Sequence, residues 1–233
     1  MFATKKPRND VLRFESPRGS ELIAAVGQTT TRIPQSGDFS RQTGAHMAAD
    51  ILTKRLRLRT WVAADREPFA ALNADAQVME HFPAPLSRAE SDALADRIEA
   101  KFQEQGFGFW AVEVPGVVRF AGFIGLSVPA FEAHFTPCVE IGWRLARPYW
   151  GQGFATEGAS ATLRHAFGTL NLPAVVAFTA QGNARSRRVM EKLGMRYDLD
   201  GDFDHPSIPA GHPLCRHVLY RINRPELPSG AVR

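Results

Sequence analysis

The chain has 233 residues, of which 44% are hydrophobic and 22% are charged. This length suits one large domain or one domain with an appendage, and the composition is that of an ordinary globular protein. No apolar run reaches the length of a membrane span. The net charge of +4 permits an acidic ligand and does not require nucleic acid. We therefore expect neither a membrane partner nor a dedicated nucleic-acid partner.

The two cysteines, Cys138 and Cys215, lie far apart in the sequence. They offer neither metal-ligand spacing nor a disulfide framework, which suits a reducing cytoplasm. We expect a cytoplasmic protein without a metal.

Residues 1–50 hold seven Lys or Arg and five Asp or Glu among many small and polar residues, with no sustained helix or strand period. The pattern predicts a disordered N-terminal extension, with translation from Met47 as an alternative. The folded domain is expected to span 51–223, followed by a short tail at 224–233.

The domain is predicted to open with a strand over 52–61, whose basic outer face consists of Arg55, Arg57 and Arg59. A helix is expected to begin at Asp65. Ser87 and Glu90 form a capping box, which predicts a longer helix to about 105. Further strands are predicted at 107–114, 120–128, 139–145, 174–179 and 217–222, and further helices at 153–170 and 184–193. This order predicts an α/β (α+β) protein with a mixed, mostly antiparallel sheet flanked by helices.

A glycine-punctuated loop connects the predicted strand 139–145 to the helix that follows it. Its sequence is RPYWGQGFATEG, from Arg147 to Gly158. Gly151 and Gly153 lack Cβ, so the backbone can turn sharply and approach a phosphate. The free N–H groups of a first helical turn, together with the helix dipole, favour an anion. The pattern predicts a site for a phosphorylated ligand.

Two common phosphate loops do not fit this segment. No Gly-Lys-Ser/Thr follows, and Thr156 stands where the dinucleotide fingerprint has its third glycine. The loop resembles the acyl-CoA pyrophosphate loop of the GNAT acetyltransferases, Gln/Arg-x-x-Gly-x-Gly/Ala, with Gly151 and Gly153 at its small positions. Pro148 departs from the pattern at its Gln/Arg position, one residue after Arg147.

A second motif, NARSRRVMEKLGM, runs from Asn183 to Met195 after another predicted strand. It resembles the Asn-x-x-Ser…Glu-Lys-Leu-Gly-Met/Phe segment of the GNAT branch that acetylates ribosomal-protein N-termini (RimJ/RimL-like). The segment by itself is also typical of a well-capped helix, with Asn183 as N-cap and Gly194 just beyond the end. Two motifs in the family's order, each after a strand, carry a resemblance over about 51–223. It implies the GNAT acyl-CoA N-acyltransferase fold.

The resemblance also implies acetyl-CoA as cosubstrate and direct transfer to a primary amine, either a protein N-terminus or a small molecule. In the family's pattern, the backbone of Trp143 and Leu145 would pair with the pantetheine arm, and Asn183 would bind its amide region. The pyrophosphate would lie against Trp150, Gly151, Gln152, Gly153, Phe154 and Ala155. The acceptor amine, and the choice between monomer and homodimer, stay open.

For proton transfer we predict Glu140 as the general base, because a partly buried carboxylate beside the thioester would have a raised pKa. A purely structural role for Glu140 is the alternative. Met190 stands where many family members carry a tyrosine that acts as the general acid, and a methionine cannot donate a proton. Ser186 is the nearest residue that could protonate the thiolate instead. The alternative is that Ser186 only caps the helix or packs against CoA.

The run 202–217 holds three histidines, two aspartates and a cysteine, but its spacing fits no metal site. It resembles the loop before the last strand in one bacterial branch of the family, where that loop borders the acceptor site. His205 or Asp204 is therefore an alternative base.

Three functions are compatible with the sequence. The first is an acetyl-CoA-dependent N-acetyltransferase. The second is a CoA-binding sensor or pseudoenzyme without turnover, suggested by Met190. The third is a nucleic-acid-associated protein that uses the basic tail and the arginines of the first strand.

Overall fold

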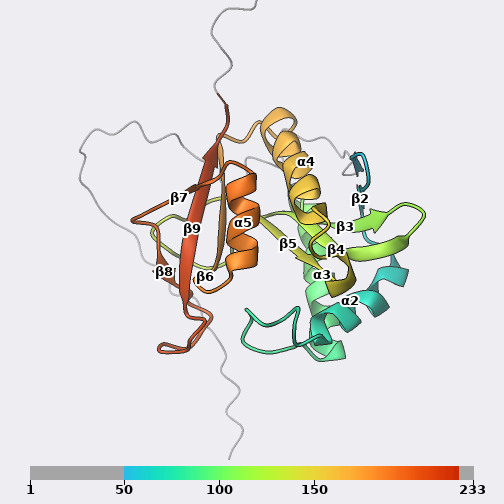
Figure 1. Ribbon diagram of the computed structural model, residues 1–233, viewed down its shortest axis with the longest axis horizontal. Helices are drawn as coiled ribbons and strands as arrows, with labels where there is room; N and C mark the ends of the chain where they lie inside the picture. Colours follow the sequence, from blue (N-terminus) through green and yellow to red (C-terminus); the bar gives the residue numbers. More distant parts are fainter. Residues whose placement is uncertain (1–49, 226–233) are drawn as a thin grey trace, which may run out of the picture. The chain divides into compact units, whose positions relative to one another are not determined.

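The computed structural model describes residues 50–225, so the predicted N-terminal extension and nearly all of the predicted C-terminal tail lie outside the described residues. Within that range nine strands form one sheet in the order β1-β2-β3-β4-β5-β6-β9-β7, with β8 also paired to β9 (Figure 1). Neighbouring strands are antiparallel except β5 and β6, which are parallel. The predicted mixed, mostly antiparallel sheet is confirmed.

The strands are β1 (Ile51–Leu52), β2 (Arg57–Arg59), β3 (Phe109–Val114), β4 (Val118–Ser127), β5 (Glu140–Leu145), β6 (Ala174–Ala180), β7 (Arg196–Tyr197), β8 (Phe203–Asp204) and β9 (Arg216–Asn223). The α-helices are α2 (Arg66–Ala74), α3 (Arg88–Gln105), α4 (Phe154–Gly168) and α5 (Ala184–Lys192), and short 3-10 turns lie at Ala63–Asp65 and Arg147–Tyr149. The elements predicted after the first strand all occur, with ends shifted by one or two residues. The short strands β7 and β8 were not predicted.

Helices cover both faces of the sheet. Ile124 of β4 packs so closely on α4 that a Cβ at Gly158 would lie 2.5 Å from its Cδ1 atom. The neighbouring residue, Phe123, points to the other face, where its ring centroid lies 6.0 Å from that of Phe69 in α2. Helix α5 lies beside α4, and α3 packs beside α2 (Figure 1).

The prediction of a single first strand over 52–61 is wrong, because the segment forms a tight turn. The Thr53 N–H donates to the Leu56 carbonyl (2.9 Å), and the Leu56 N–H donates to the Thr53 hydroxyl (2.8 Å). This turn folds β1 back onto β2 as an antiparallel pair. The alternation of leucine and arginine does not reveal the turn, because it depends on a side-chain hydrogen bond.

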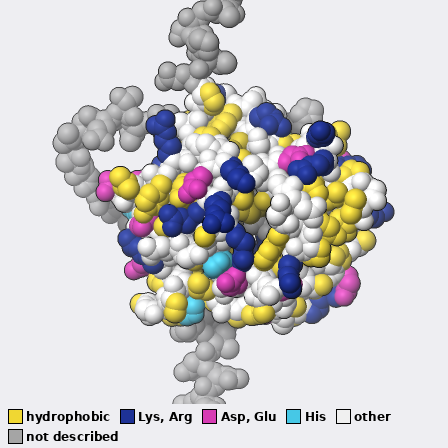
Figure 2. Space-filling model, in the orientation of Figure 1, with side chains coloured by type: hydrophobic (Ala, Val, Ile, Leu, Met, Phe, Trp, Pro, Cys, Tyr) yellow, Lys and Arg dark blue, Asp and Glu magenta, His cyan; other side chains and the backbone are white. Residues whose placement is uncertain are grey.

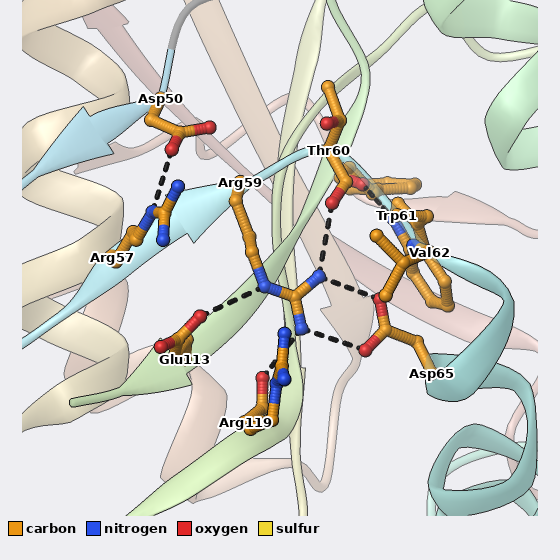
Figure 3. A network of polar contacts seen from close by, with 10 residues as sticks. Asp50, Arg57, Arg59, Thr60, Trp61, Val62, Asp65, Glu113 and Arg119 are labelled. Carbon is orange, nitrogen blue, oxygen red and sulfur yellow. Dashed lines mark hydrogen bonds and ion pairs between the residues drawn. The ribbon is translucent and has the colours of Figure 1, made fainter. Parts of the chain in front are cut away.

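The placement of Arg59 on a basic outer face is also wrong, since its side chain is only 7% exposed. Its guanidinium group makes five hydrogen bonds (Figure 3). Two go to the carboxylate of Asp65 (2.7 and 2.8 Å) and one to Glu113 (3.0 Å). The other two go to the carbonyls of Thr60 (3.0 Å) and Arg119 (2.7 Å). A buried cation is thus fully paired where β2, β3, β4 and the start of α2 meet.

The other two arginines of the predicted basic face are paired with acids. Arg57 Nε lies 2.7 Å from Asp50 Oδ2, and Arg55 Nε lies 2.6 Å from Glu157 Oε2. The basic face that suggested nucleic-acid binding is therefore neutralised within the fold.

The two predicted helix caps differ in outcome. Ser87 and Glu90 form the predicted capping box at the start of α3, with the Ser87 N–H donating to the Glu90 carboxylate (2.8 Å). Asp65 does precede α2, but its carboxylate binds Arg59 and the Val62 N–H (2.9 Å) instead of capping that helix.

Across residues 50–225, no helix has both the length and the apolar character needed to cross a membrane.

Replacing Arg59 by alanine is expected to lower the free energy of unfolding by about 3–5 kcal/mol, because it leaves the buried Asp65 carboxylate without its cation. Urea denaturation would measure this. The matched control is Arg57→Ala, which removes an exposed ion pair and should change stability by less than about 1 kcal/mol. Equal effects of the two substitutions would contradict the structural role of the Arg59 network.

Candidate active site

The sheet opens between its two parallel strands. β5 pairs with β4 at six positions, but with β6 only at Glu140 and Val176. At that point the Val176 N–H donates to the Val139 carbonyl (2.9 Å). Beyond it the two strands diverge (Figure 1), so the β6-facing edge of β5 is left without a strand partner.

Two residues of β5 direct both their N–H and C=O groups into this opening. The Ala146 N–H donates to the Ala121 carbonyl (2.8 Å), and in an antiparallel pair such bonds alternate along the strand. Ile141, Trp143 and Leu145 therefore direct their N–H and C=O groups away from β4. Ile141 adjoins the bridge to Val176 of β6, so Trp143 and Leu145 are the two that face the opening. The indole of Trp150 donates to the Leu145 carbonyl (2.7 Å), so Leu145 offers only its N–H to a ligand.

The loop after β5 is held in one shape by its glycines and by internal hydrogen bonds. Gly151 and Gly153 have φ angles of 72° and 81°, a region that favours glycine. The Trp150 N–H donates to the Arg147 carbonyl (3.1 Å), and the Gln152 side chain donates to the Pro148 carbonyl (2.7 Å).

Helix α4 begins directly after this loop, with Gly153 as N-cap and no side chain capping its first turn. The Glu157 N–H closes the first turn on the Gly153 carbonyl (2.9 Å). The N–H groups of Phe154, Ala155 and Thr156 therefore lack an intrahelical partner and lie at the positive end of the helix dipole. This is a backbone site for an anion.

Arg55 fixes the loop from outside. Its Nη1 donates to the Gln152 carbonyl (2.9 Å), and its guanidinium lies 4.6 Å from the ring centroid of Phe154. Its partner Glu157 also accepts the Thr53 hydroxyl (2.7 Å). Burial would raise the pKa of Glu157, but the hydrogen bonds from Thr53 and Arg55 outweigh it and lower that pKa. The one acid in the first turn of α4 is thus already paired, which reduces its repulsion of an anion.

A cavity of about 750 Å³ fills the opening between β5, β6, α3 and α5. Ten of the eleven predicted site residues line it: Glu140, Trp143, Leu145, Trp150, Gly151, Gly153, Phe154, Ala155, Asn183 and Ser186. Gln152 does not line the cavity. Its side chain is exposed and bound to the loop, so only its backbone is available to a ligand.

Glu140 lies where the sheet begins to open. Burial raises the pKa of its carboxyl to about 7, while Lys101 and a hydrogen bond from Ser127 partly offset this rise. Lys101 on α3 donates to the Ser127 hydroxyl (2.8 Å) and to the Val128 carbonyl (2.9 Å). Desolvation lowers the pKa of Lys101, and the charge of Glu140 opposes that change. A carboxyl with a pKa near neutrality can accept a proton from a cationic amine.

Asn183 and Ser186 meet the cavity at the start of α5. Asn183 is the N-cap, as predicted, and its side-chain oxygen accepts the Ser186 N–H (3.1 Å). The Ser186 hydroxyl is not used in this cap, so it remains available on the cavity wall. Met190, one turn later, is buried and also lines the cavity.

Two histidines line the cavity at its β9 side, with ring centroids 5.0 Å apart. His217 Nδ1 lies 3.1 Å from the Cys215 carbonyl, so this nitrogen carries the proton. His205 Nδ1 accepts the Ser207 N–H (3.2 Å). Burial lowers the pKa of His205, and the charge of the neighbouring His217 lowers it further, so the neutral ring is favoured.

Asp204, the other alternative base, is exposed and does not line the cavity. Its Oδ1 atom lies 3.4 Å from Nη1 of Arg216. In the described part of the chain, no group of three His, Cys, Asp or Glu side chains is arranged to hold a metal ion.

Sequence reasoning missed Lys101, Arg144 and the aromatic ring of Phe109, which all line the cavity. Strand alternation was the available signal for Arg144, because Glu140, Gly142 and Arg144 share one face of β5. Lys101 and Phe109 are brought to this face by α3 and β3, which no local pattern indicates.

Comparison with known proteins agrees with this geometry. The sequence model of the family described as "Acetyltransferase (GNAT) domain" matches residues 55–196. The chain is 29% identical over 172 residues to an uncharacterized N-acetyltransferase, YnaD, of Bacillus subtilis, covering 74% of this chain and 95% of YnaD. It is 32% identical over 181 residues to the FsC-acetyl coenzyme A-N(2)-transacetylase of Aspergillus fumigatus, covering 75% and 76% of the two chains.

Solved structures share the fold. A GNAT-family acetyltransferase from Bacillus anthracis matches with a TM-score of 0.62 and 26% identity, over 76% of this chain and 99% of that one. RimL, the ribosomal L7/L12 alpha-N-protein acetyltransferase in complex with coenzyme A, matches with a TM-score of 0.60 over 75% and 98% of the chains. At 17% identity this second likeness concerns the fold alone. The chain belongs to the GNAT acetyltransferase family.

Proposed function

We propose that this protein transfers an acetyl group from acetyl-CoA directly to a primary amine. The observation that carries the proposal is the continuous path from the unpaired edge of β5 to the uncapped first turn of α4. The strand edge offers hydrogen bonds to an amide-containing chain, and the helix start offers them to an anion. Pantetheine and pyrophosphate are joined in that order in CoA.

The residues around the cavity suit such a ligand. The Trp143 C=O group and the Leu145 N–H would bind the pantetheine arm. The N–H groups after Gly153 would bind the pyrophosphate. Arg185, Arg188 and Lys192 of α5 also line the cavity. Figure 2 shows Lys and Arg side chains gathered over the region of α5, which would attract the phosphate charges.

The chemistry needs a neutral amine close to the thioester. Bound acetyl-CoA supplies an activated acyl group. Glu140 takes the proton from the amine, and the backbone N–H of Trp143 polarises the thioester carbonyl. A C–N bond forms as the C–S bond breaks, and the thiolate receives a proton. The Ser186 hydroxyl is our candidate donor for that proton, because Met190 cannot supply one.

Transfer without a covalent enzyme intermediate is supported by the cysteines. Burial raises the pKa of Cys138 to about 12, so it is not a thiolate at neutral pH. Neither Cys138 nor Cys215 lines the cavity. Direct transfer in a ternary complex leaves Glu140 as the central group.

Gly153→Glu is expected to weaken acetyl-CoA binding by roughly 100-fold or more, since it places a like charge at the anion site and a side chain at positive φ. Calorimetry would measure the affinity and circular dichroism the fold. The control is Gly168→Glu, which adds the same charge at the far end of α4, where a Cβ meets no atom within 4 Å. Unchanged affinity in Gly153→Glu would show that the loop does not bind the pyrophosphate.

Glu140→Gln is expected to lower kcat/KM by roughly 10²–10⁴-fold, the usual contribution of a general base. The wild-type rate should rise as the pH increases through about 7, because the carboxylate form is the active one. The variant should lose this rise. Glu132→Gln, at an exposed acid before β5, is the control. A full rate with an unchanged pH profile in Glu140→Gln would assign the base elsewhere, with His205 the next candidate.

The same assay addresses the sensor hypothesis. A protein that binds acetyl-CoA and consumes none with any amine in a broad panel would be a sensor. Acetyl-CoA-dependent acetylation that requires Glu140 would exclude that function.

A further inference from the structure

Arg144 is a poorly solvated cation of the cavity that has no counter-ion. Arg144 of β5 lines the cavity, and no carboxylate within residues 50–225 forms an ion pair with it. Its Nε atom is buried and has no hydrogen-bond partner there. Desolvation lowers the pKa of Arg144 to about 10, the sign of a cation held in a poorly solvated place. Arg59, by contrast, has an acceptor for each of its five N–H groups.

The guanidinium of Arg144 is nonetheless firmly oriented. Its Cζ atom lies over two aromatic rings, 4.0 Å from the centroid of Phe82 and 5.3 Å from that of Phe123. Its Nη1 donates to the Asn73 side-chain oxygen (2.6 Å), and Asn73 in turn donates to the Ser91 hydroxyl (2.9 Å). The aromatic contacts and the Asn73 bond hold the group in place. Nε is closed off by the packing, so Nη2, to which no residue within 50–225 offers an acceptor, is the donor that can bind a carboxylate from the cavity.

Glu140 and Arg144 lie on the same face of β5, separated by Gly142. Four residues of an extended strand place their Cα atoms ~13 Å apart. The space between them has an aromatic floor: a Cβ at Gly142 would lie 3.1 Å from Cε1 of Phe109, whose ring centroid is 5.0 Å from that of Phe123. A ligand that reaches from Glu140 to Arg144 would therefore lay an apolar body over these rings.

The charges along this face select among amines. Lys101 lies at the Glu140 end and Arg144 at the other, so two cations flank one carboxylate. A polyamine or an aminoglycoside would place its additional positive charges near them, which is unfavourable. An acceptor with an anionic group distant from its amine would be favoured at the Arg144 end.

We propose that the acceptor is a primary amine that carries a carboxylate at the far end of an apolar body, and that Arg144 binds the carboxylate. The amine then lies at Glu140 and the apolar body over Phe109. This inference rests on the proposed acetyl transfer and specifies its acceptor. An acceptor without a carboxylate would leave the Arg144 cation unpaired.

The test compares acceptors that differ only in the carboxylate. Purified full chain is assayed for acetyl-CoA-dependent acetylation of a panel of aliphatic and aromatic ω-amino acids of increasing length, each beside its carboxamide. We expect kcat/KM to favour the acids by about 10- to 100-fold, the range of a charged hydrogen-bonded pair. In Arg144→Gln this preference should fall below about threefold, mainly through KM. Arg119→Gln, which changes an exposed arginine of β4 outside the cavity, should keep the preference.

A second readout does not need turnover. Calorimetric titration of the CoA-loaded protein with the N-acetyl forms of the same ω-amino acids and of their amides measures the carboxylate preference directly. Amines acetylated equally well as acids and amides would overturn the role of Arg144 while leaving acetyl transfer intact. If no amine is consumed in the turnover assay, the proposed acetyl transfer is wrong. If the calorimetric titration then also shows equal binding of acids and amides, or no binding of either, the carboxylate site is wrong as well. Because Arg144→Gln removes an unpaired charge, we expect it to fold, which its thermal unfolding would confirm.

Discussion

The divergence of β5 from β6 after Glu140 is the constraint on which the rest of the site depends. A strand held by β4 along its whole length, and by β6 at one position only, must leave backbone donors and acceptors exposed within the sheet. Such groups need partners, because an unpaired buried peptide group is costly. The same divergence lets the following loop and the start of α4 face the same cavity. It also places Glu140 where two environments meet: the packed sheet, which raises its pKa, and the open cavity, where an amine can reach it.

Two arginines, the buried Arg59 and the partly buried Arg144, have contrasting surroundings. Arg59 joins three strands and the start of α2 through a complete set of acceptors, all from the fold itself. Arg144 receives one acceptor, from Asn73, and two aromatic rings. The fold satisfies the guanidinium of Arg59 completely, whereas that of Arg144 has a single protein acceptor and lines the cavity, which is why we assign Arg144 to the acceptor substrate. The contrast is local and internal, so it does not depend on any relative.

Much of the site could be predicted from the sequence because it consists of backbone. Gly151 and Gly153 mark positive φ angles, and Asn183 marks a cap, so each is visible in a short window of residues. The first strand was misread because its turn depends on a hydrogen bond to the Thr53 side chain, and because the burial of Arg59 depends on distant partners such as Glu113. Arg144 stayed unassigned for the same reason: its oriented state comes from Asn73, 71 residues away. Local sequence patterns predict elements and loops, whereas the pairing of charges is decided by the tertiary fold.

Calorimetric titration of the full chain with acetyl-CoA, CoA and NAD would show whether the opening in the sheet is a CoA site. We predict that both CoA species bind, because the strand edge and the helix start are shaped for pantetheine joined to pyrophosphate. We expect no comparable binding of NAD, which has the pyrophosphate but lacks the pantetheine arm. Failure to bind either CoA species would contradict the assignment of the opening as the acetyl-CoA site, and would leave the chain with the fold of the family but without its chemistry.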